Sequence, residues 1–223
     1  MFKVLKFRFC IGLFCLAAIP FTKAQQLSPL KNKVYYSVED ALTENLQARQ
    51  LNLRDQELLH IPNNVELLEQ LQFLNLMRND ITFCSEALFN LSNLETLNLK
   101  LNGITVLPDN IGNLKKLIHL NISANKLKSL PNTIGNLKDL KVLYLSLNAL
   151  TTLPTSIGQC KNLTDLDLQN NHISYLPSSF KELQNLKLLD LSHNQLYELD
   201  NSWIASAQLE RLNLEDNVLN WLP

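Results

Sequence analysis

Three aspartates are the residues in this sequence best suited to chemistry: Asp165, Asp167 and Asp190. The sequence repeats every 23 residues, the spacing between Asp167 and Asp190, so we expect these two on neighbouring strands, about 4.8 Å apart. Carboxylates at that separation could share Ca²⁺. No loop supplies the remaining oxygen ligands, so we interpret the group as a solvated acidic patch and predict neither a metal nor another cofactor.

The histidines and cysteines predict no second reactive centre. His119 and His193 lie in different repeats, with no cysteine or carboxylate cluster at ligand spacing, and we interpret them as surface residues. Cys84 and Cys160 lie three repeats apart, at least ~14 Å, whereas a disulfide needs Cα atoms within about 7 Å. Because both occupy leucine positions, we predict buried free thiols. Without a phosphate-binding loop or a serine beside a base, we predict that the protein is not an enzyme.

The elements that must position these side chains are copies of one unit. Residues 117–131 read L-x-x-L-x-I-x-x-N-x-L-x-x-L-P, and alternating apolar residues such as Leu120 and Ile122 predict a short strand with one buried face. The first apolar positions of eight such repeats are Ala48, Leu71, Leu94, Leu117, Leu140, Leu163, Leu186 and Leu209.

An asparagine follows each predicted strand except the first, where Gln56 takes its place. We predict that these side chains stack and bond backbone groups that the turn leaves open. The column consists of Asn79, Asn102, Asn125, Asn148, Asn171, Asn194 and Asn217.

These features resemble leucine-rich repeats of the 23-residue class, in which a segment with the pattern L-P-x-x-I-G-x-L leads from one strand back to the next. We call this segment the return; residues 107–114 and 153–158 carry its pattern. The repeats are similar to Ras-suppressor-like and plant Ras-group repeats and to exported bacterial members. The resemblance covers about residues 34–223. It implies an α/β solenoid: an arc with a parallel β-sheet on the concave face and short helices or 3₁₀ turns on the convex face. Two returns depart from it, where Cys84-Ser85 replaces Leu-Pro and Asp200 replaces proline; the seventh return, at residues 202–206, is predicted to form a fuller helical turn.

The first 24 residues are predicted to be a signal peptide. Lys3, Lys6 and Arg8 precede an apolar run at residues 9–21, which is shorter than the roughly 20 residues needed to span a bilayer. We predict cleavage after Ala24, export to a secreted, periplasmic or cell-surface location, and no membrane insertion afterwards. An uncleaved N-terminal anchor is the alternative.

Residues 25–47 are predicted to be a lead-in and an N-terminal helical cap, followed by eight repeats at residues 48–223. Ser37 with Asp40 three residues later predicts a helix from about residue 38 to residue 47. The eighth repeat stops incomplete, without a C-terminal cap. We therefore expect either a fragment of a longer protein or an open edge strand that favours self-association.

Strand positions between the buried ones are predicted to form the binding surface. Basic residues come early in these columns (Arg54, Arg78) and acidic residues late (Glu215, Asp216), with exposed apolar residues between them. We expect Tyr144 near the centre. The candidate binding residues are Phe73, Met77, Lys100, Leu101, His119, Val142, Tyr144, Leu147, Asp165, Asp167, Leu188 and Asp190.

The function predicted from these observations is non-enzymatic binding of a protein or peptide on the concave face. The formal net charge of −1 argues against nucleic acid as the partner. Three alternatives stay open: a structural or adhesive spacer of the cell envelope, the recognition part of a longer enzyme or signalling protein, and an intracellular scaffold that keeps residues 1–24.

Overall fold

The structure is a computed structural model that describes residues 33–44, 46–200 and 208–220. The predicted signal peptide, its cleavage site, most of the lead-in and the altered return at residues 202–206 lie outside the described residues.

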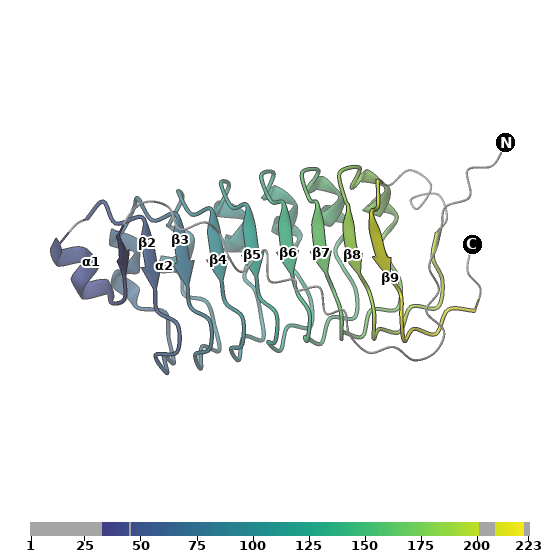
Figure 1. Ribbon diagram of the computed structural model, residues 1–223, viewed down its shortest axis with the longest axis horizontal. Helices are drawn as coiled ribbons and strands as arrows, with labels where there is room; N and C mark the ends of the chain where they lie inside the picture. Colours follow the sequence, from purple (N-terminus) through teal and green to yellow (C-terminus); the bar gives the residue numbers. More distant parts are fainter. Residues whose placement is uncertain (1–32, 45, 201–207, 221–223) are drawn as a thin grey trace. The chain divides into compact units, whose positions relative to one another are not determined.

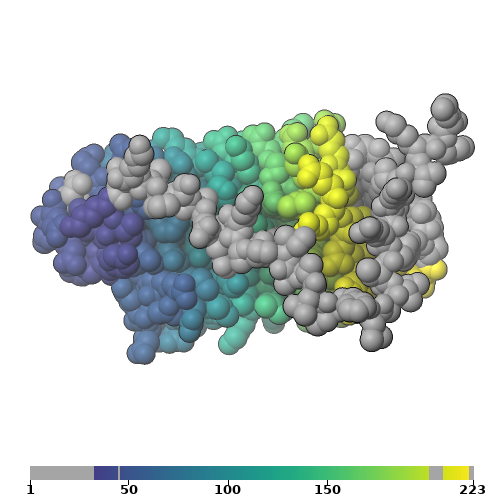
Figure 2. Space-filling model, in the orientation of Figure 1, coloured from purple at the N-terminus to yellow at the C-terminus, as the bar shows by residue number. Residues whose placement is uncertain are grey.

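One parallel sheet takes one strand from each repeat. In the described residues nine strands follow one another in sequence order, and from β2 onward each residue pairs in register with the residue 23 positions later, as His119 does with Val142 (Figure 1). In Figure 2 the sequence colours likewise pass from one repeat to the next. The strands are β1 (Val34–Tyr35), β2 (Gln50–Asn52), β3 (Phe73–Asn75), β4 (Thr96–Asn98), β5 (His119–Asn121), β6 (Val142–Tyr144), β7 (Asp165–Asp167), β8 (Leu188–Asp190) and β9 (Arg211–Asn213).

Short helical segments lie on the other side of the core. Leu120 at the centre of β5 is 1 % exposed, and Ile134 and Leu137 in the return of the same repeat are fully buried. The leucine-rich-repeat α/β solenoid predicted from the sequence is therefore confirmed. The helical segments are η2 (Asn63–Leu67), α2 (Glu86–Phe89), η3 (Asp109–Asn113), η4 (Asn132–Asn136), η5 (Thr155–Gln159) and η6 (Ser178–Glu182).

Proline determines where most 3₁₀ turns begin. Pro131 precedes η4 with a φ of −71°, and its carbonyl oxygen accepts a hydrogen bond from the Ile134 amide at 3.1 Å. The fixed φ of proline suits this extended position, and proline needs no amide partner there. In the second repeat, where Ser85 occupies this position, the α-helix α2 forms instead.

Glycine allows successive 3₁₀ turns to stack closely. A Cβ atom built on Gly135 would lie 2.5 Å from the carbonyl oxygen and 2.9 Å from the Cβ of Ser156 in the next repeat. Gly112 meets Thr133 in the same way, at 2.8 Å from its Cβ. The small residue in the L-P-x-x-I-G pattern is thus required by the neighbouring repeat.

The N-terminal cap differs from the prediction in two respects. Helix α1 (Val38–Glu44) begins as predicted, with Ser37 Oγ accepting the Asp40 amide at 3.0 Å, but it does not reach residue 47. Leu46 is 57 % exposed, so it does not extend the buried face of the helix. Strand β1, which pairs with β2, was not predicted.

Candidate functional site

The asparagine column forms the predicted hydrogen-bond ladder. Asn125 Nδ2 donates to the carbonyl oxygens of Leu99 at 3.0 Å and Ile122 at 3.1 Å, and its Oδ1 accepts the Ile104 amide at 2.9 Å. Each asparagine therefore joins its own repeat to the preceding one. In the first repeat, Gln56 bonds the Tyr36 carbonyl at 2.7 Å instead, which ties the cap to the ladder.

A second, mostly polar column lies at the last residue of strands β2 to β9. Asn121 Oδ1 accepts the amide of Ser123 at 3.0 Å, and Asp167 Oδ1 accepts the amide of Gln169 at 3.1 Å. Tyr144 occupies the same column, and a tyrosine ring cannot make this short bond. Tyr144 therefore departs from the structural role of its column.

A third column precedes the asparagines and has a left-handed backbone. Its members all have φ between 53° and 58°: Asp55, Arg78, Leu101, Ala124, Leu147, Asn170, His193 and Asp216. Asparagine and aspartate tolerate this conformation, whereas other residues with a Cβ lose roughly 1–2 kcal/mol in it. Leu101 and Leu147 adopt it with side chains that are 42 % and 54 % exposed.

The predicted binding residues all lie on the strands or the turns that follow them, on the face of the sheet opposite the core, which we call the concave face. Leu101 and Leu147 are exposed, whereas Val142 and Tyr144 are 9 % and 8 % exposed. We expected solvent at all four positions, so for Val142 and Tyr144 that expectation was wrong. Both side chains lie outside the core cluster although they are buried. The half-buried residues are Phe73, Met77, Lys100, His119, Asp165, Asp167, Leu188 and Asp190.

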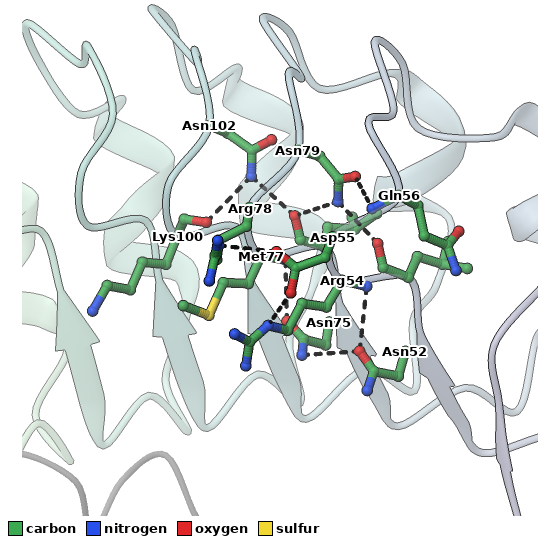
Figure 3. A network of polar contacts seen from close by, with 12 residues as sticks. Asn52, Arg54, Asp55, Gln56, Asn75, Met77, Arg78, Asn79, Lys100 and Asn102 are labelled. Atoms are coloured by element: carbon green, nitrogen blue, oxygen red, sulfur yellow. Dashed lines mark hydrogen bonds and ion pairs between the residues drawn. The ribbon is translucent and has the colours of Figure 1, made fainter.

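The early repeats carry a basic network. The Asp55 carboxylate accepts from Arg54 Nε at 2.6 Å and from Arg78 Nε at 2.9 Å (Figure 3). All three side chains are roughly half exposed, so each ion pair adds only a little stability, about 0–1 kcal/mol. Because two guanidinium groups share one carboxylate, the network keeps a net positive charge.

The late repeats carry the three aspartates, which are less solvated than expected. Burial raises the pKa of Asp167, and nearby Asp190 raises it further, against hydrogen bonds from Ser146 and the Gln169 amide that lower it. Asp190 accepts the Ser192 amide at 2.9 Å and the Ser192 hydroxyl at 2.6 Å. Within the described ranges, no group of three or more His, Cys, Asp or Glu residues could hold a metal ion.

Three family models match this chain. The leucine-rich repeat region model matches residues 82–168, and two further leucine-rich repeat models match residues 176–219 and 162–183. The chain is a leucine-rich-repeat protein.

Solved structures share these leucine-rich repeats. A leucine-rich-repeat protein of Leptospira interrogans is 38 % identical, with a TM-score of 0.82 over 86 % of this chain and 49 % of its own. The ectodomain of the Arabidopsis thaliana receptor kinase GASSHO1/SCHENGEN3, in complex with CASPARIAN STRIP INTEGRITY FACTOR 2, is 33 % identical, with a TM-score of 0.73 over 84 % of this chain and 23 % of its own. The functional domain of InlJ from Listeria monocytogenes is 29 % identical, with a TM-score of 0.67 over 78 % of this chain and 36 % of its own.

This leucine-rich-repeat chain therefore spans about half the length of the Leptospira protein and less of the other two. Among curated proteins, no sequence matches it. In the described part of the chain, no helix combines the length and apolar character that crossing a membrane requires.

The cysteines and histidines of the repeats are placed much as predicted. Cys84 and Cys160 are free thiols, and burial raises their pKa values to about 12 and about 11. Cys160 is fully buried, as predicted, but Cys84 is only partly buried. Burial lowers the pKa of His119, and nearby Lys141 lowers it further, whereas Asp165 raises it. His193 lies 2.9 Å from the Asp216 carboxylate.

Sequence reasoning missed a second apolar surface beside the sheet. Leu59, Phe83 and Val106, on the segments that follow the asparagine turns, are 62 %, 50 % and 66 % exposed, and the Phe83 and His60 ring centroids are 5.1 Å apart. His60, Phe83 and Val106 are spaced by 23 residues, so this column could have been read from the sequence.

Proposed function

We propose that this leucine-rich-repeat chain is a non-enzymatic binding module that holds a protein or peptide on its concave face. The observation that carries the proposal is the pair Leu101 and Leu147, two exposed leucines in left-handed backbone. Asparagine would be both more soluble and less strained at these positions. Residues that cost stability without serving the fold are typical of binding surfaces.

The comparison with the Arabidopsis ectodomain, which is in complex with another factor, supports a role in protein recognition. We also propose the 23-residue L-P-x-x-I-G-x-L class for the repeats and export through residues 1–24. A spacer role, or a recognition role within a longer protein, would use the same scaffold. The edge of strand β9 is a further candidate for self-association.

Partner capture tests the proposal. The purified chain and a Leu101→Asn, Leu147→Asn variant would be used as baits in extracts of the source cells, with circular dichroism to check folding. We expect the variant to lose at least tenfold of the captured partner, because an exposed apolar anchor contributes strongly when its partner buries it.

Val106→Asn is the matched control, since it makes the same kind of change at an exposed side chain away from the concave face. Equal capture by the wild type and the double variant would contradict the proposal. If Val106→Asn lost the captured partner and the double variant did not, the binding surface would lie beside the sheet, around Val106, and not on the concave face.

A further inference from the structure

Charge is segregated along the concave face. The first three repeats contribute Arg54, Arg78 and Lys100 with one aspartate between the arginines, and the last three contribute only acidic charge to the strand columns apart from the exposed Arg211. The two repeats between them, from His119 to Leu147, carry no charged residue in these columns.

The acidic end forms no ion pair within the described residues, although the Lys100 ammonium lies near enough to Asp167 to lower the pKa of that carboxyl. Asp165, Asp167 and Asp190 form no ion pair with any described lysine or arginine; they accept hydrogen bonds from neutral groups such as the Thr164 hydroxyl, 2.5 Å from Asp165. At the basic end, the single Asp55 carboxylate is shared by two guanidinium groups. Each end is therefore left with charge that a ligand could neutralise.

The uncharged repeats in the middle of the concave face offer a binding position for an apolar side chain. Leu101 and Leu147 protrude from the third and fifth repeats, and Ala124 occupies the equivalent position in the repeat between them. Two repeats correspond to about 10 Å at the strand spacing of ~4.8 Å, which leaves room above Ala124 for one apolar side chain.

Building on the function proposed above, we propose that the ligand is an extended peptide segment that lies across strands β2 to β8 with its charges segregated. Its acidic end lies over Arg54, Arg78 and Lys100, an apolar side chain sits over Ala124, and its basic end lies over the three aspartates. The six strand intervals span about 29 Å, the length of roughly nine extended residues.

Two synthetic peptides of identical composition test this. One has three glutamates at one end, leucine and serines in the middle and three lysines at the other end; the second has the same residues with alternating charges. We expect fluorescence anisotropy to show that the segregated peptide binds at least tenfold more tightly, by a margin that shrinks as salt screens the charges. Equal affinities, or no detectable binding of either peptide, would overturn the proposal.

A variant localises the effect. Asp165→Asn, Asp167→Asn and Asp190→Asn together remove the acidic end, and Asn121 shows that asparagine can make the hydrogen bond of this strand column. We expect this triple variant to abolish the advantage of the segregated peptide. Asp80→Asn, Asp109→Asn and Asp139→Asn together form the control, since these exposed aspartates lie elsewhere, and should leave the advantage intact.

The result separates the two proposals. If partner capture depends on Leu101 and Leu147 but both peptides bind alike, the concave face binds a ligand whose orientation charge does not direct, and only the present inference is wrong. If the wild type and the Leu101→Asn, Leu147→Asn variant capture the partner equally, the proposed function itself is wrong.

Discussion

Two adjacent columns of the repeat differ sharply although they share one turn. The asparagine column has the same residue in seven repeats, and each side chain bonds the backbone of its own repeat and of the preceding one. The residue just before it changes from aspartate to arginine, leucine, alanine and histidine while φ stays within 53–58°. Uniform chemistry thus marks the residues that maintain the fold, and variation on a constant backbone marks positions available for binding.

The largest effect should come from the asparagine column. Asn171 is 4 % exposed and bonds the carbonyls of Leu145 and Leu168 and the Leu150 amide at 3.0–3.1 Å. We expect Asn171→Ala to lower the free energy of unfolding by about 3 kcal/mol, because several buried backbone groups lose their partner. Urea denaturation measures this. Asn170→Ala, one residue earlier, should cost no more than about 1–2 kcal/mol, the strain of alanine in left-handed backbone; equal losses at both positions would remove the distinction between the columns.

The next effect concerns close packing between repeats. Gly135→Ala should destabilise the fold by about 2 kcal/mol, because its Cβ would meet the Ser156 backbone at 2.5 Å. Gly103→Ala is the control, since its Cβ would meet the Thr82 methyl group at 3.3 Å and the Ile81 carbonyl oxygen at an ordinary 3.6 Å. Thermal unfolding of the two variants compares them, and a milder effect at Gly135 than at Gly103 would contradict this account of stacking.

A smaller effect of opposite sign is expected in the variable column. Leu147→Asn should raise the free energy of unfolding by up to about 1 kcal/mol, because asparagine tolerates the φ of 56° better than leucine does. Chemical denaturation would compare this variant with Val106→Asn, which changes an exposed apolar residue outside this column. The difference between the two variants gives the contribution of the left-handed backbone to the free energy of unfolding. A loss of stability in Leu147→Asn would mean that leucine at this position supports the fold.

The smallest effect is expected at Asp167 and depends on pH. Its pKa in the folded chain is raised above the ordinary 3.8, so the folded state retains the proton more readily and stability falls as pH rises through this range. We expect Asp167→Asn to raise the melting temperature at pH 7, with the gain disappearing below pH 3.8. Asp80→Asn, at an exposed position, serves as the reference; a gain that persists in acid would exclude burial of charge as the cause.

The sequence alone determined the fold because every repeat is built from local contacts and contacts with its neighbours. The 23-residue period predicted the strand columns and the asparagine ladder, and Ser37 with Asp40 predicted the start of the N-terminal helix; all three are confirmed. It could not predict strand β1, which consists of only two residues and is held by its pairing with Gln50 and Leu51.

Only the tertiary structure decided how open each concave position is. Val142, Tyr144 and Leu147 have the same apolar character in the sequence, yet the first two are 9 % and 8 % exposed and Leu147 is 54 % exposed. Exposure depends on side chains one repeat away on either side and on a left-handed φ, and no single repeat encodes both. The twelve candidate residues as a binding site remain a prediction, and the structure now gives most weight to Leu101 and Leu147.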